Sequence, residues 1–317
     1  MIVPVVLLGY AVVMGTAGGR WLQAARWPGR APRLGISAWQ ALSGSTVAAV
    51  VLAGATLAVP VLPFGGRAAQ LMHACWLAIR DRYSTAAGAT VSSIGILVAT
   101  AILGRLAYHL IRTWRGARRC QRAQRQHLTL LGGLDRRPTP NHVVVTDPRP
   151  LVYCLPGRGG IVVQTTAAET LLSGSQLQAV LAHERAHLRE RHNLPLLGAA
   201  ALSAAFPFVP AFRRAEAEIG VLIEMRADDV ATAGHPPRVL AEALVLLAAS
   251  PAPASALGAG GSSALRRCER LLQPRDPLGR RGFAIVVAGL ALTMLPMLLA
   301  ALPAAIAVIL DYCPPGA

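Results

Sequence analysis

Four long apolar segments constrain this chain more than any other feature. They cover residues 2–18, about 37–64, about 86–111 and 283–310. A helix needs roughly 20 mostly apolar residues to cross a hydrocarbon core about 30 Å thick. The composition agrees, since 54% of the 317 residues are hydrophobic and the mean hydropathy is +0.47. The sequence therefore predicts a mostly α-helical, multi-pass membrane protein.

The distribution of arginine predicts how these segments are oriented. Arginines gather after the first and third segments and before the fourth, whereas residues 67–83 carry few and the tail after Leu310 carries none. By the positive-inside rule, the arginine-rich stretches are expected in the cytoplasm, with both termini outside. The first segment lacks a preceding basic region, so we expect it to be retained as an anchor.

The net charge of +16 raises the question of a nucleic-acid partner. The arginines of this chain, however, lie at the ends of the apolar segments together with Trp21, Trp27 and Trp114, as expected for contacts with anionic lipid headgroups. No nucleic-acid recognition motif is evident. The lipid bilayer is therefore the expected partner, and no direct binding of nucleic acid is expected.

The membrane pattern predicts three parts. Residues 1–111 hold three transmembrane helices with their loops. Residues 112–281 form a cytoplasmic domain that includes a further apolar stretch, and residues 282–317 form a last transmembrane helix with a short external tail.

A polar motif within the second part indicates a metal site. His183 and His187 are four residues apart, so on a helix they share a face and can bind one metal, with Glu184 beside it. A catalytic zinc site has three protein ligands and an open position. Glu224 is the best candidate for the third ligand, and Asp228, one turn further, can accept the free ring N–H of a ligand histidine.

The surrounding sequence resembles the membrane-bound gluzincin peptidases. The resemblance rests on residues 152–163, residues 177–187 and Arg191-His192, and it extends over roughly residues 140–275. It is closer to the BlaR1/MecR1-type family (M56) than to the HtpX/Ste24-type family (M48). One departure from M56 is Asp228-Asp229, where many members have Cys-Asp; the spacing favours Asp228 as the carboxylate behind a ligand histidine.

This resemblance implies a cytoplasmic gluzincin-type (α+β) domain with one zinc ion per chain. It implies zinc ligands at His183, His187 and Glu224, a general base at Glu184 and a supporting carboxylate at Asp228. The implied activity is that of a zinc endopeptidase that cleaves proteins at the cytoplasmic face of the membrane.

Three functions fit these features. BlaR1-type proteins suggest regulated cleavage of a cytoplasmic repressor, although a chain without lysine has no S-x-x-K motif for β-lactam sensing. HtpX-type proteins suggest quality-control proteolysis. A membrane scaffold with a purely structural zinc site is the non-enzymatic alternative, but three ligands and a base carboxylate favour an open site.

Local patterns predict how the site is framed. Residues 141–146 and 160–166 are expected to be strands, the second as an edge strand beside the active-site helix, where a substrate would add as a further strand. Ser173 or Ser175 is expected to cap that helix, and Pro236-Pro237 to end the helix of Glu224. Residues 251–263 are expected to form a mobile loop.

Residues 194–212 are apolar yet lie between His187 and Glu224, which must meet at one metal. A single crossing of the membrane would separate these ligands. Gly198, Pro207 and Pro210 permit a bend, so we favour a re-entrant or membrane-dipping helical hairpin. A buried core helix of the peptidase domain is the alternative.

The remaining cysteines and histidines give weaker signals. Five cysteines without a C-x-x-C pair predict no disulfide framework, although Cys75 and Cys313 are both assigned outside and could pair. His192 is interpreted as structural. The other histidines are interpreted as ordinary polar or interfacial residues: His73, His109, His127, His142 and His235.

Overall fold

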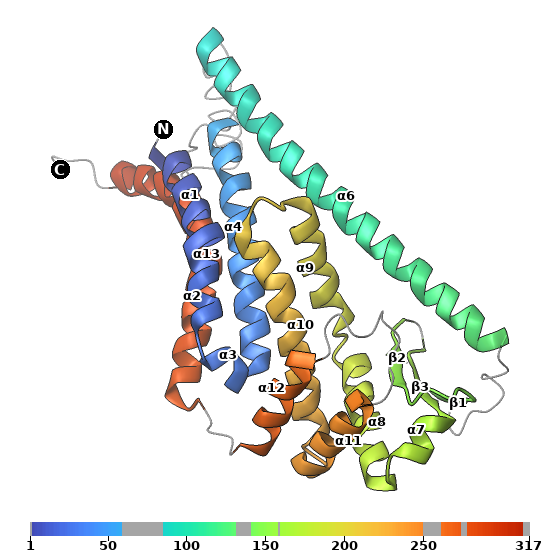
Figure 1. Ribbon diagram of the computed structural model, residues 1–317. Coiled ribbons are helices and arrows are strands. Elements are labelled where there is room, and N and C mark those ends of the chain that lie inside the picture. The colour runs from blue at the N-terminus through green and yellow to red at the C-terminus, as the bar shows by residue number, and fades with distance from the viewer. Residues whose placement is uncertain are drawn as a thin grey trace.

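A computed structural model describes residues 2–58, 85–130, 141–157, 159–249, 261–273 and 278–312 (Figure 1). Four of its helices are long and apolar enough to cross a membrane, which confirms the predicted set. The first runs over residues 2–24 through α1 (Ile2–Val13), a π-helical turn η1 (Met14–Gly18) and α2 (Gly19–Ala24). The others lie in α4 (Pro32–Ala58), α6 (Ala86–Leu130) and α13 (Arg280–Tyr312).

The helix α6 joins the membrane part to the domain that follows. It continues unbroken past residue 111, so the predicted boundary at 111/112 falls inside a helix rather than in a loop. Near its end, Leu128 is 3% exposed and packs with Val143, Leu155 and Val163 of the sheet. Figure 1 shows α6 as a long oblique helix that reaches from the membrane bundle to the strands.

The sheet has three strands, β1 (His142–Val145), β2 (Val152–Leu155) and β3 (Ile161–Thr165), in the order β1-β3-β2. The central strand β3 pairs parallel with β1 and antiparallel with β2. The prediction that residues 160–166 form the edge strand was therefore wrong. All five residues of β3 are buried, and such β-branched, fully buried runs are typical of a central strand. The edge beside α8 (Gly174–Arg189) is β2.

Residues 194–212 form the turn and one arm of a helical hairpin. The helix α9 (Asn193–Ala205) leads outward and α10 (Pro210–Ala231) leads back, packed against each other and between α6 and α4 (Figure 1). At the turn, Phe206 and Phe212 pack on Val47 of α4 and Ile102 of α6. The side chain of Arg105 donates a hydrogen bond to the Ala205 carbonyl, which satisfies a free group at the end of α9. Because of the hairpin, α10 returns alongside α8, where the two histidines of the motif lie.

Short helices complete the domain around α8 and α10. They are α3 (Trp27–Arg30), α7 (Thr166–Leu171), α11 (Pro237–Ala249) and α12 (Gly261–Leu272). The helix α10 ends at Ala231, before the prolines predicted to end it, and the Thr232 hydroxyl donates to the Asp228 carbonyl. Pro237 is instead the first residue of α11, because proline is tolerated at the first turn of a helix.

Several predictions fall partly or wholly outside the described residues. They concern His73, Cys75, Cys313, residues 59–64 of the second apolar segment and residues 251–260 of the expected loop. Residues 261–263 of that loop are helical. Among the described residues, Cys120, Cys154 and Cys268 are free cysteines.

Candidate metal centre

The helix α8 carries the two histidines of the motif. It starts with a capping box in which the Ser173 side chain accepts from the Gln176 backbone N–H and the Gln176 side chain accepts from the Ser173 N–H. Three turns on, His183 and His187 lie on one face, and their Nε2 atoms are 3.1 Å apart. The helix start therefore fixes which face of α8 presents the imidazoles.

The returning helix α10 brings Glu224 to the same point. Its Oε2 lies 3.4 Å from His183 Nε2, and its Oε1 lies 3.6 Å from His187 Nε2. Ligand atoms about 2.0–2.1 Å from a tetrahedral zinc ion lie roughly 3.4 Å from one another. The three side chains, whose ligand atoms all lie within 4.8 Å of one another, thus fit a zinc ion without rearrangement.

Each imidazole also has a partner behind it. His183 Nδ1 lies 3.0 Å from Oδ1 of Asp228, which is fully buried. His187 Nδ1 lies 3.1 Å from His192 Nδ1, and His192 Nε2 lies 3.3 Å from Oε2 of Glu190. Such partners fix the ring orientation and leave Nε2 free for the metal. His192, interpreted as structural from the sequence, directly contacts a candidate ligand.

The carboxylate of Glu184 lies beside this group. Burial raises the pKa of Glu184 above its ordinary value, while His183 and a hydrogen bond with Cys154 act in the opposite direction. Cys154 is on the edge strand β2, and burial together with the Glu184 charge raises the pKa of its thiol. The candidate base therefore lies between the metal ligands and the edge of the sheet.

The electrostatics of the site favour a cation among these side chains. Burial alone would lower the pKa of His183, but hydrogen bonds with Asp228 and Glu224 outweigh it and raise the pKa to about 9. Burial and the neighbouring His183 lower the pKa of His187 to about 4. Although burial opposes it, the His183 hydrogen bond and the nearby cations lower the pKa of Glu224 to about 2. The two carboxylates of α10 thus stabilise one positive charge at the point where the ligand atoms meet.

Arg267 of α12 is a residue of the site that the sequence reasoning missed. Its guanidinium lies 2.9 Å from Glu224 Oε2 and donates to both carboxylate oxygens of Asp228, at 2.7 and 2.9 Å. One turn on, Arg270 donates to Asp229, so Asp228 and Asp229 have separate arginine partners. The available signal in the sequence was that Arg267 and Arg270 are spaced to share a face of one helix and that two adjacent aspartates, Asp228 and Asp229, lie on another. The sequence reasoning attributed both arginines to membrane orientation.

The structure brings together all five residues that the sequence singled out: His183, Glu184, His187, Glu224 and Asp228. The comparison with protein families gives an independent result. Residues 117–247 match Peptidase family M48. The match supports a metallopeptidase of the M48 type and gives no support to the M56 assignment. Comparison with curated proteins and with solved structures found no match.

The matched segment runs from the end of α6 to the end of α11 and includes the sheet, both histidines and Glu224. Peptidases of family M48 are zinc-dependent, and the geometry of the His-His-Glu group fits that metal. The chain is thus a mostly helical protein with four candidate membrane spans, a small sheet and a segment that matches M48 peptidases.

Proposed function

We propose that this chain is a membrane-embedded zinc endopeptidase that cleaves protein substrates. The observation that carries the proposal is the convergence of His183, His187 and Glu224, from two helices of a segment that matches M48 peptidases, with Glu184 beside them. Three ligands leave one position open, which is typical of catalytic rather than structural zinc sites. A purely structural scaffold would not need the half-buried carboxylate of Glu184 next to an open site.

Each side chain of the site has its own role in the proposed hydrolysis. His183, His187 and Glu224 would hold the zinc ion, which supplies a Lewis acid that activates water and polarises the scissile carbonyl. Glu184 takes the proton of the attacking water and later delivers it to the leaving amine. Asp228 and His192 hold the two imidazoles in the tautomer that leaves Nε2 free.

The edge strand β2 offers a place for the substrate backbone. Leu151 is bonded to Thr165, so alternate residues of β2 bond to β3, and the backbone groups of Val152 and Cys154 point away from β3. An extended peptide can add along this free edge through main-chain hydrogen bonds. Because Cys154 contacts Glu184, such a peptide would pass directly beside the base.

Removal of the metal tests this function. We expect the full-length protein in detergent to cleave casein, to lose this activity after treatment with 1,10-phenanthroline, and to recover it when about one equivalent of zinc is added back. Magnesium serves as the control cation, because it prefers oxygen ligands and octahedral geometry. Full activity of the zinc-free protein would exclude the proposed mechanism.

The M48 match is compatible with quality-control proteolysis of the HtpX type and gives no support to cleavage of a repressor. Cleavage of a repressor in a signalling pathway rests on the M56 resemblance alone. The genetic neighbourhood discriminates between the two roles. An adjacent gene for a small winged-helix repressor would favour signalling, whereas a stress operon would favour quality control.

We further propose that the active site faces the cytoplasm and that both termini lie outside, since the arginine-rich stretches follow spans one and three and precede the last. Single cysteines introduced into a cysteine-free variant at Thr146 and Ser263 should resist a membrane-impermeant maleimide in intact cells. A cysteine at Arg67 should react. Labelling at Thr146 would reverse the orientation and point to substrates outside the cytoplasm.

A further inference from the structure

A cavity of about 900 Å³ borders α8 at Arg185, Leu188 and Arg189, and the candidate zinc ligands do not line it. Its walls are α6, the end of α8, the start of α9 and the β2–β3 turn. The helix α6 contacts α9 on the membrane side and contacts the sheet at Leu128. The cavity lies between these two contacts. The proposed peptide hydrolysis does not use this cavity.

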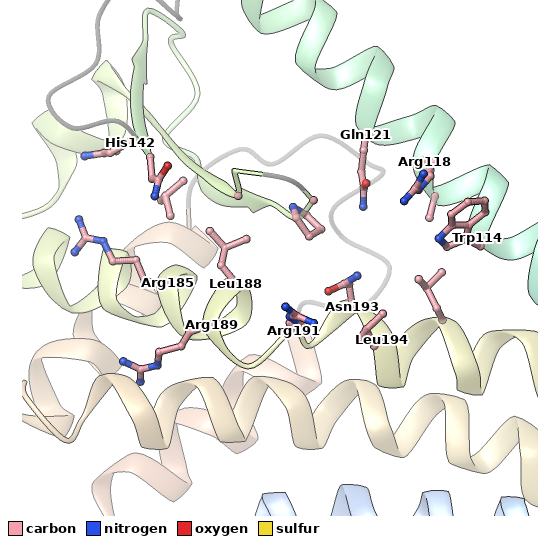
Figure 2. Close-up of a pocket in the computed structure, with 17 residues that line it drawn as sticks. Trp114, Arg118, Gln121, His142, Arg185, Leu188, Arg189, Arg191, Asn193 and Leu194 are labelled. Carbon is pink, nitrogen blue, oxygen red and sulfur yellow. The ribbon is translucent and has the colours of Figure 1, made fainter.

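The charged side chains that line this cavity are all positive. Arg118, Arg185, Arg189 and Arg191 line it, and no aspartate or glutamate does among the described residues. Within the same described ranges, none of these four forms an ion pair with a carboxylate, whereas Arg226, Arg267 and Arg270 all do. Figure 2 shows Arg191 and Asn193 facing Gln121 of α6, with Arg118 and Trp114 on the same wall as Gln121. A cavity lined by unpaired guanidinium groups and amides is suited to an anion.

Arg191 reaches the cavity at a conformational cost. Its φ angle is +52°, and it is the one non-glycine residue with positive φ among the described residues. A left-handed conformation costs a residue with a Cβ atom roughly 1–2 kcal/mol relative to the right-handed one. Glycine would remove that cost, so an arginine here fits a role for its side chain.

The cavity also lies at the boundary of the membrane segment. Trp114 is one helical turn beyond Leu110 and Ile111, which end the apolar part of α6 and are exposed. Arg118 lies 4.0 Å above the Trp114 ring, and Leu194, 54% exposed, lines the cavity from α9. Tryptophan and arginine at the end of an apolar span are typical of the headgroup region of a bilayer.

From these features we propose that the cavity binds the phosphate group of an anionic glycerophospholipid, with the acyl chains along the exposed apolar surface of α6 and α9. Arg118 and Arg191 contact the phosphate, and Gln121 and Asn193 contact the glycerol and headgroup hydroxyls. An acidic protein segment fits less well, because exposed Leu194 lines the cavity from α9 and an acidic segment would leave it uncovered.

The test uses full-length protein in detergent micelles that contain equal amounts of phosphatidylglycerol and phosphatidylcholine. Native mass spectrometry counts the lipids that each chain retains. The Arg118→Gln/Arg191→Gln variant should bind phosphatidylglycerol at least tenfold more weakly than wild type. Arg115→Gln/Arg119→Gln is the matched control, because both arginines are exposed on α6 but do not line the cavity. Its binding should be within twofold of wild type.

Arg191→Gly keeps the test valid if the double variant folds poorly. Glycine adopts positive φ without strain, so the melting temperature should stay the same or rise while phosphatidylglycerol binding falls. Wild-type binding in both Arg191 variants would overturn the proposal. So would equal binding of phosphatidylcholine, equally tight binding of free glycerol phosphate, or displacement of the lipid by oligoglutamate, which would indicate a site for acidic protein segments.

Discussion

The Glu184→Gln variant is expected to keep its fold and its zinc but to lose nearly all proteolysis. The amide has the size of the carboxylate but cannot accept a proton from water, and general acid–base catalysis contributes about 10²–10⁴-fold. The loss should appear as a fall of at least a hundredfold in the rate of casein cleavage at saturating substrate.

The matched control is Glu169→Gln, which makes the same change at an exposed glutamate of α7. It should cleave casein at the wild-type rate. Cleavage by Glu184→Gln within tenfold of wild type, with zinc retained, would show that Glu184 is not the base.

The Arg267→Leu variant should show the largest loss of stability among single substitutions near the site. Arg267 donates to both oxygens of Asp228, whose side chain is 1% exposed, so its removal takes away the arginine partner of a buried carboxylate and leaves only His183 beside it. Breaking a buried pair by removing one partner typically costs about 3–5 kcal/mol. Thermal unfolding of the metal-free protein in detergent measures the effect.

Arg266→Leu provides the control, since this neighbouring arginine is exposed and the variant removes the same charge from α12. Its melting temperature should lie close to that of wild type. Equal melting temperatures for the Arg266 and Arg267 variants would contradict the assigned role of Arg267.

The sequence predicts features that repeat with a local period. The four spans follow from apolar length, and the pair His183 and His187 follows from helical spacing. The hairpin of residues 194–212 also follows, because two ligands on one metal exclude a single crossing. For the spans and the histidine pair, a short stretch of chain carries the whole signal, whereas the hairpin follows from the two ligands that flank it.

The features that sequence reasoning missed depend on contacts between distant segments. Arg267 is 39 residues from Asp228, and in the sequence it cannot be distinguished from the arginines expected at the ends of the membrane spans. The strand β2 has only four residues, next to Pro150 and Pro156, so its place at the sheet edge depends on pairing with β3. His192 contacts His187 because the chain turns at Arg191 directly after α8.

The most direct test of the central claim is the zinc content of the purified protein. We expect about one zinc per wild-type chain and almost none in His187→Ala, because two ligands hold the ion far less tightly than three. His192→Phe should bind zinc with an affinity about 10–100-fold lower, since it removes the partner behind His187. A His187→Ala protein that retains the wild-type zinc content would contradict the assignment of the metal centre.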